Sequence, residues 1–190
     1  MKKRVNTLFL TLFTLSSIIF TSCEESGNYI YDIPPFDINI IIENSNGNNL
    51  LDPEYEGNII DNLTLTYNDE VYKIDTEDFD ISTRALPSIF HGLRLLRDDN
   101  GRHFITFGNF DGETDFNNEK ISISYGKGKN DEVTFTNKVK TGSYIQKIDI
   151  KRTIKLNGKT VNPDIDIPTN DRQWKYSHEQ PNGKAFVITR

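Results

Sequence analysis

The sequence predicts an all-β protein, built as an antiparallel β-sandwich of about seven to nine strands. Apolar residues recur at every second position in several segments, which is the pattern of strands with one buried face. Clusters rich in Asn, Asp and Gly, such as NSNGNN, YNDEVY and LNGK, separate these segments and favour tight turns. Short strands with such turns between them are typical of an immunoglobulin-like sandwich.

The alternation is clearest in FDINIII, LTLTY, KISISY and VTFTNKV. Thr, Ser and Lys occupy most of the outward positions, so we expect the outer faces to be solvated. The inward positions are predicted to be Phe36, Ile38, Ile40, Ile42, Leu63, Leu65, Tyr67, Ile121, Ile123, Tyr125, Val133, Phe135 and Val139.

The longest alternating run, YIQKIDIKRTIKL, carries Arg152 on the same side as Ile150, Ile154 and Leu156. A charge on an apolar face needs an explanation, and a bend or a change of sheet near Arg152 is one alternative. In the segment LLDP, we expect Leu50 to close one end of the sandwich together with its neighbour Leu51.

The segment RALPSIFHGLRLLRDDNG is ambiguous, because its apolar residues also fit helical spacing. Gly92 in its middle and the turn DDNG, followed at once by RHFITFG, favour a hairpin. We predict a strand from about His91 to Arg97, with an irregular or single-turn helical approach to it.

The first 22 residues are typical of a signal peptide. Basic residues at positions 2–4 precede an apolar run over residues 8–20 that is too short to span a membrane. The only cysteine, Cys23, follows directly after Thr21 and Ser22.

These residues resemble the lipobox of bacterial lipoproteins, and Glu24 and Glu25 are similar to the acidic residues after the lipidated cysteine in Bacteroidetes surface lipoproteins. NGNNLLDP and the alternating strands also resemble small β-sandwich lipoproteins of that group. The resemblance implies that Cys23 is lipidated and that the protein is an outer-membrane lipoprotein exposed at the cell surface. The alternative is an ordinary secretory peptide with an incidental free thiol, which would be a liability in an oxidising compartment.

The predicted organisation is a signal peptide over residues 1–22, a lipidated cysteine and flexible tether over 23–35, and a single β-sandwich domain over 36–190. Removal of the signal peptide leaves 19 basic against 28 acidic side chains, a net charge near −9. Such a charge argues against a nucleic-acid partner. The expected membrane contact is through the N-terminal lipid.

Metal and catalytic motifs are sparse. The three histidines match no metal-binding spacing, although His91 and His103 could approach each other across the predicted hairpin. Among the acidic loops, DGETD is the best of the weak calcium candidates, with Asp111, Glu113 and Asp115 as its ligands. We therefore expect no cofactor other than calcium, and no hydrolase nucleophile motif is present.

Trp174, the only tryptophan, and Tyr176 lie two residues apart in RQWKYSHEQ, so in a strand both would share one face. Paired aromatic side chains bind sugars or form interface hot spots, which makes this pair the candidate ligand-binding residues. The alternative is that Trp174 covers an edge of the core.

The leading hypothesis is a non-enzymatic binding or interaction module that presents its loops to a glycan or a protein. A structural subunit of a surface assembly such as a fimbria, built by strand addition, is the second. A carboxylate-dependent glycan hydrolase is the third, because acidic residues are abundant.

Overall fold

The strands of the protein form one mixed sheet instead of two antiparallel ones. The computed structural model describes residues 33–75, 90–126, 128, 130–141, 148–167 and 183–190, and Ile33–Arg190 cluster as one unit. The elements are β1 (Phe36–Glu43), a 3-10 helix η1 (Ile60–Asn62), β2 (Thr64–Tyr67), β3 (Glu70–Asp75), β4 (Gly92–Arg97), β5 (His103–Phe110), β6 (Phe116–Ser124), β7 (Asp131–Thr141), β8 (Ile148–Leu156), β9 (Lys159–Val161), β10 (Ile165–Asp166) and β11 (Lys184–Thr189).

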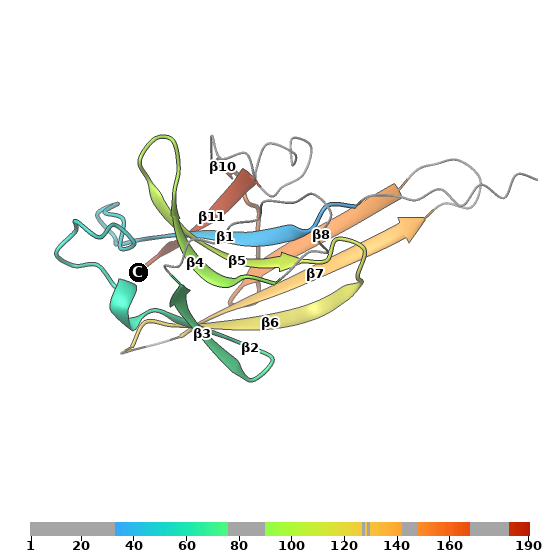
Figure 1. The fold of residues 1–190 in the computed structure, drawn as a ribbon, viewed down its shortest axis with the longest axis horizontal. Helices are drawn as coiled ribbons and strands as arrows, with labels where there is room; N and C mark the ends of the chain where they lie inside the picture. Colours follow the sequence, from blue (N-terminus) through green and yellow to red (C-terminus); the bar gives the residue numbers. More distant parts are fainter. Residues whose placement is uncertain (1–32, 76–89, 127, 129, 142–147, 168–182) are drawn as a thin grey trace, which may run out of the picture. The chain divides into compact units, whose positions relative to one another are not determined.

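Within the described residues, the sheet contains 11 strands in the order β10-β11-β1-β5-β4-β3-β2-β6-β7-β8-β9 (Figure 1). Two neighbouring pairs, β1 with β11 and β3 with β4, run parallel, and the other pairs run antiparallel. The all-β class is therefore confirmed, whereas the antiparallel immunoglobulin-like sandwich of about seven to nine strands is not, because the described strands form one mixed, curled sheet of 11. Alternating apolar residues show that one face of a strand is buried. They do not show whether the neighbouring strands run parallel or antiparallel to it.

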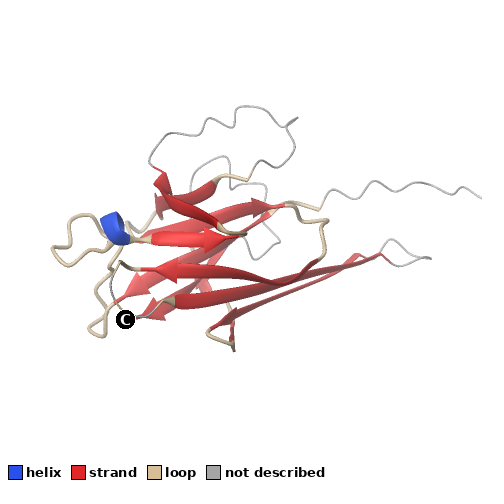
Figure 2. Ribbon diagram, turned by 90° about the horizontal axis from the view of Figure 1, so that it is seen from below, coloured by secondary structure: helices blue, strands red, loops and turns tan. Residues whose placement is uncertain are grey.

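The sheet curls at β3, which pairs with strands on both sides. Residues 70–73 pair with β2, and the last two residues, Ile74 and Asp75, pair with β4. We call β10, β11, β1, β5 and β4 the first half-sheet, and β2, β6, β7, β8 and β9 the second half-sheet. Seen from below, the strands of the curled sheet lie in layers around a shared interior (Figure 2).

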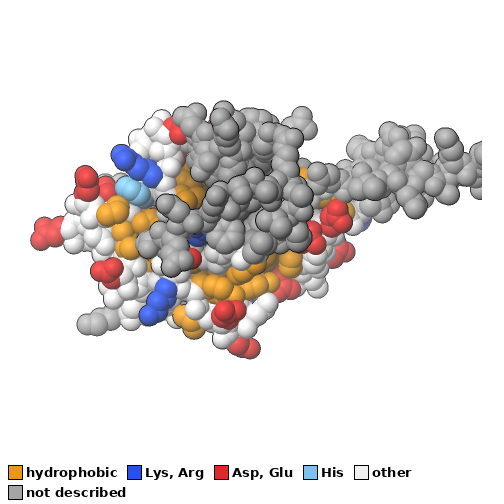
Figure 3. All heavy atoms as spheres, in the orientation of Figure 1, with side chains coloured by type: hydrophobic (Ala, Val, Ile, Leu, Met, Phe, Trp, Pro, Cys, Tyr) orange, Lys and Arg blue, Asp and Glu red, His pale blue; other side chains and the backbone are white. Residues whose placement is uncertain are grey.

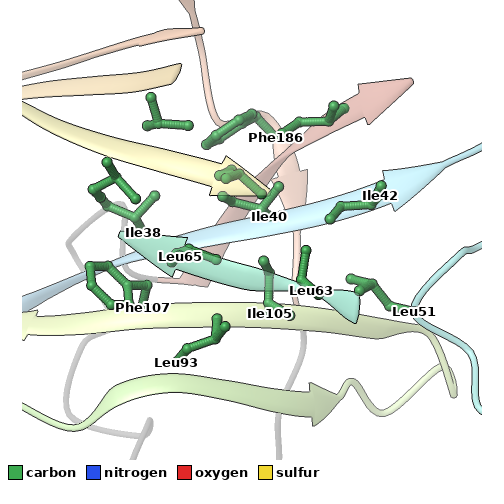
Figure 4. Close-up of a cluster of buried hydrophobic side chains, with 14 of the residues drawn as sticks. Ile38, Ile40, Ile42, Leu51, Leu63, Leu65, Leu93, Ile105, Phe107 and Phe186 are labelled. Carbon is green, nitrogen blue, oxygen red and sulfur yellow. The ribbon is translucent and has the colours of Figure 1, made fainter. Parts of the chain in front are cut away.

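The interior holds one main hydrophobic core, to which both half-sheets contribute. Ile38 and Ile40 of β1 face Leu65 of β2, with Ile105 and Phe107 of β5 beside them (Figure 4). Each of these side chains is at most 1% exposed. Full burial of such a side chain contributes about 1.5–3 kcal/mol, so this cluster is a major source of stability.

The predicted inward positions are confirmed for β1, β2, β6 and the first half of β7, where the side chains are buried or pack against the core. The outer face of β1 differs from the expectation of a solvated face. Ile41 is completely buried there, in a second cluster with Phe104, Ile167 and Ala185. This strand is therefore apolar on both faces near its end.

The two ends of the sheet are joined by a very short connection. β9 ends at Val161 and β10 begins at Ile165, so only Asn162, Pro163 and Asp164 separate them. Four steps along the chain span at most about 15 Å. Because β9 and β10 are the terminal strands of the sheet, this connection brings its two ends close together and almost closes it into a ring.

Several predicted turns are confirmed. Asn68 and Asp69 both have positive φ in the β2–β3 hairpin, and Asn157 and Gly158 do so in the β8–β9 hairpin. This is the geometry of two-residue turns that follow the twist of the strands. The predicted strand from about His91 to Arg97 and its return strand in RHFITFG are present as the β4–β5 hairpin. Leu51 is fully buried and closes one end of the core, as predicted for LLDP.

Among the described residues, no helix is long and apolar enough to cross a membrane.

Candidate functional site

A pocket of about 190 Å³ lies where the two ends of the curled sheet approach each other. We call it the seam pocket. Strands from both half-sheets contribute to it, and the connection after β9 forms part of its wall. Its lining residues are Phe36, Asp37, Asn39, Phe135, Thr136, Arg152, Thr153, Ile154, Thr160, Val161, Asn162, Pro163 and Lys184.

Arg152 is the charged residue that the second half-sheet places in this pocket. Its strand does not bend: β8 pairs with β7 without interruption from Ile148 to Leu156, so the predicted bend or change of sheet is wrong. The side chain instead extends across the seam, where its guanidinium lies 4.4 Å from the centre of the Phe36 ring on β1. A cation over an aromatic face is stabilised by the ring quadrupole. This contact explains a charge on the apolar side of β8.

The guanidinium of Arg152 is partly removed from water. Burial lowers the pKa of Arg152, because the charged form loses hydration. An arginine nevertheless remains protonated at neutral pH, since its ordinary pKa is above about 12. The pocket therefore contains a fixed and partly dehydrated positive charge.

Asn137 fixes the position of this charge. Its side chain is fully buried on β7, and its Oδ1 accepts a hydrogen bond of 3.0 Å from Nε of Arg152. Its Nδ2 donates to the carbonyl oxygens of Gly112 and Thr114, at 3.0 and 2.8 Å. One amide thus connects Arg152 to the turn between β5 and β6.

Asp37 brings a negative charge to the same pocket from β1. Its Oδ1 lies 3.1 Å from Nε2 of His91, and both side chains are less than a tenth exposed. The same oxygen accepts the backbone N–H of Asn109, which has a φ of 69° and occupies an irregularity in the β1–β5 pairing. Asp37 therefore holds the local bulge and the start of the β4–β5 hairpin.

Lys184, at the start of β11, is the second cation among the described residues that line the pocket. Its Nζ lies 3.6 Å from a carboxylate oxygen of Asp166, and both side chains are largely exposed. Exposed pairs of this kind are screened by water and salt. Arg152 is therefore the stronger source of positive potential inside the pocket.

The acidic loop predicted as a weak calcium site uses its carboxylates to hold the chain. Asp111 accepts hydrogen bonds from the backbone N–H of Glu113 and the hydroxyl of Thr114. Asp115 accepts the backbone N–H of Val139 on β7. No group of three metal-ligating side chains occurs in the described ranges. Acidic side chains are scattered over the face shown in Figure 3 and do not gather in one patch.

The two histidines of the hairpin do not meet. His103 pairs with Arg97 at one end of the β4–β5 hairpin, whereas His91 precedes the opposite end, where Gly92 pairs with Gly108. The expectation that they could approach each other is therefore wrong. The sequence shows how far each histidine lies from the turn. It does not show the register of the two strands, which decides which residues face each other.

The remaining predicted site residues lie outside the described residues. These are Cys23, the predicted lipidation site, and Trp174 and Tyr176, the predicted ligand-binding pair. The sequence pattern singles out Arg152 as an unusual charge but not as a site residue, and it does not single out Asn137. The signals that could have identified them are a charged residue among the alternate apolar positions of β8 and an asparagine on the inward side of β7.

Comparison of the chain with protein-family models, curated proteins and solved structures finds no match.

Proposed function

We propose that the protein is a lipid-anchored binding module of the outer-membrane surface, tethered through Cys23, and that it takes up a small ligand in the seam pocket. The observation that carries this proposal is the pocket itself, which combines aromatic and aliphatic walls with one desolvated arginine. Ligand sites of proteins are typically concave, mostly apolar and provided with a few polar groups. An apolar cavity of about 150 Å³ is large enough to bind benzene, so this pocket has room for a small molecule.

The lining of the pocket favours binding over hydrolysis. A glycoside hydrolase of the usual kind needs two carboxylates that face the bond to be cleaved. Asp37 is the one carboxylate among the lining residues that the structure describes, and its Oδ1 is held by His91 and Asn109. With these partners, the Asp37 carboxylate holds the backbone around the pocket in place, which is a structural role.

A subunit that assembles by strand addition is the second candidate function. Strand addition needs an exposed edge of some length. Within the described residues, β9 pairs with β8 only from Ile154 to Leu156, whereas β8 begins at Ile148. The part of β8 that precedes Ile154 is therefore the edge at which a partner strand would add.

The proposal is tested by a binding screen of the purified full-length protein. Soluble glycans, small metabolite-like acids and amines, and matrix proteins are tested with and without calcium. The pocket is blocked with Thr160→Trp, at an exposed lining position of β9. Lys159→Trp is the matched control, because Lys159 is its exposed neighbour and does not line the pocket.

We expect a ligand whose affinity falls by at least about tenfold in Thr160→Trp and is unchanged in Lys159→Trp. If binding is lost in Trp174→Ala and retained in Thr160→Trp, the site lies elsewhere and the role of the pocket is refuted. If no ligand binds, the assembly subunit becomes the better hypothesis.

A further inference from the structure

The edge of β8 offers a place for one more strand. In the part of the chain that the structure describes, β9 covers β8 only from Ile154 onward, whereas β8 begins at Ile148. In the same part, β6 accompanies β7 only as far as Asn137. The end of the β7–β8 hairpin, residues 138–141 with 148–151, is therefore two-stranded there (Figure 1). A two-stranded hairpin is marginally stable in water, so an added strand would stabilise it.

The backbone of Ile150 faces this edge. Successive residues of an antiparallel strand direct their N–H and C=O groups to alternate sides. The two-residue turn of the β8–β9 hairpin makes Leu156 face β9, so every second residue before it faces the same side. Val139, which lies opposite Ile150 on β7, accordingly donates its N–H to Asp115 and not to β8. Ile150 thus presents one donor and one acceptor to a strand beside β8.

The residues on either side of Ile150 carry opposite charges. Asp149 and Lys151 are both exposed, and both point to the outer face of β8. Across the ladder, Asp149 lies opposite Lys140, whereas Lys151 lies opposite Lys138. Like charges directly opposite each other destabilise a sheet. An acidic side chain on the other side of Lys151 would offset this repulsion.

A second copy of the chain would supply that acidic side chain. Two copies that continue one sheet through the same edge are related by a two-fold axis, and their β8 strands run antiparallel. With the axis at Ile150, Asp149 of each copy lies opposite Lys151 of the other. An axis at either neighbour would instead place Asp opposite Asp or Lys opposite Lys. Ile150 would also face its counterpart and join the two Ile150–Val139 pairs into one apolar row.

The charge of Arg152 leaves this edge accessible. Charged side chains that point inward at an edge are one device by which proteins prevent strand pairing. The guanidinium of Arg152 is instead held by Asn137 of β7 and by the ring of Phe36 on β1. Lysine at an edge also repels a strand that brings a positive charge, and Asp149 of a second copy brings the opposite charge to Lys151.

We propose that the protein forms a two-fold symmetric dimer in which the β8 strands of two copies pair antiparallel, with Ile150 on the axis and Asp149 opposite Lys151 at two places. This inference goes beyond the proposed function and needs no ligand in the seam pocket. Because the contact uses the same surface on both copies, it closes at two copies. It therefore differs from the open-ended strand addition of a fimbrial subunit.

Sedimentation equilibrium of the purified full-length protein in detergent, over a range of protein concentrations, measures the association. We expect a monomer–dimer equilibrium in the wild-type protein. Lys151→Asp tests the register, because it places acidic side chains opposite Asp149 of the other copy while it removes the like-charge pair with Lys138 inside each chain. We expect the dissociation constant of the dimer to rise at least about tenfold. An unchanged constant would overturn the inference.

The charges are then exchanged and matched with a control. Asp149→Lys alone should also weaken the dimer, and the double variant with Asp149→Lys and Lys151→Asp should recover most of the affinity, because opposite charges face each other again. The control is Lys159→Asp, which makes the same change of charge at an exposed residue of β9 outside the proposed contact. Equal weakening in this control would show a general effect of net charge and contradict the proposed pairing.

A cross-link tests the position of the axis. Residues that exchange both hydrogen bonds across an antiparallel pair have Cα atoms about 5.5 Å apart, which a disulfide can span. In a Cys23→Ala background, Ile150→Cys should give a disulfide-linked dimer under mild oxidation, and Thr153→Cys, further along the same strand, should not. A monomer at every concentration, growth beyond two copies, or cross-linking in Thr153→Cys instead of Ile150→Cys would each refute the proposed dimer.

Discussion

The guanidinium of Arg190 lies 3.1 Å from a carboxylate oxygen of Asp131, so the last residue of the chain is bonded to the first residue of β7. The same oxygen accepts the hydroxyl of Tyr125 at 2.8 Å, and the other oxygen accepts the amide of Asn157 at 2.8 Å. Arg190 also lies 4.0 Å from the centre of the Tyr125 ring. Because Arg190 follows β11 and Asp131 begins β7, this cluster connects the two half-sheets.

Asp131→Ala is expected to lower the free energy of unfolding by about 3 kcal/mol. The substitution removes the common acceptor and leaves the buried hydroxyl of Tyr125 and the guanidinium of Arg190 without it. Urea unfolding followed by circular dichroism measures the change. The control is Glu132→Ala, whose carboxylate forms a largely exposed pair with Lys120 and is expected to contribute less than about 0.5 kcal/mol. A similar loss in both variants would contradict the role of the cluster.

The same cluster predicts a loss of stability in alkaline solution. Burial raises the pKa of Tyr125 above its ordinary value, and the hydrogen bond to Asp131 raises it further. The folded state therefore keeps the phenolic proton at a pH where the unfolded chain releases it, near 10. The stabilisation is complete below about pH 10 and is lost as the pH rises above that value.

Urea unfolding of the wild-type protein and of Tyr125→Phe between about pH 9 and 11 measures this contribution. We expect a steeper decline of the free energy of unfolding in the wild-type protein, because the variant lacks the phenolic group. Parallel declines would refute the assignment to Tyr125.

Asn137→Ala is expected to destabilise the protein by about 3 kcal/mol, because the buried carbonyl oxygen of Gly112 and the partly buried one of Thr114 lose their donor. It should also weaken the binding of any ligand that contacts Arg152, because Arg152 loses its hydrogen bond to the amide. Thermal unfolding and ligand titration measure the two effects. Asn117→Ala, at an exposed position of β6, is the control and should change stability by less than about 0.5 kcal/mol. Unchanged stability in Asn137→Ala would show that the amide is dispensable.

Cys23→Ala is expected to release the protein from the membrane fraction, because the lipid is the expected anchor. The folding of residues 33–190 should be unchanged, since Cys23 lies outside this unit. Cell fractionation and circular dichroism of the released protein measure both outcomes. Recovery of the variant in the membrane fraction would contradict the lipoprotein hypothesis.

The strands were predictable where one face is buried and the other is polar. Leu65 alternates with Thr64 and Thr66, and Ile121 and Ile123 alternate with Ser122, so the period of two is visible in the sequence. The strand β11 was not predicted, because Ala185 and Phe186 are both buried and the pattern does not alternate there. A strand covered on both faces resembles any short apolar run.

The seam pocket was not predictable, because it depends on which distant segments become neighbours. Phe36 and Arg152 lie far apart in the sequence, and their contact follows from the curl of the whole sheet. The sequence contained a local sign of it, the arginine among the isoleucines of β8, and no sign of its partner. Likewise, Asn137 is one of many asparagines until the register with β8 places it beside Arg152.

The parallel pairing of β1 with β11 joins segments that lie far apart in the sequence. The residues from Asn39 to Glu43 on β1 pair with Ala185 to Thr189 on β11. Contacts so distant in sequence give the protein a high contact order, and such β topologies fold in milliseconds to seconds. β1 therefore keeps one unpaired edge until β11 has docked, and loss of Ala185 to Thr189 would leave that edge open in the middle of the sheet.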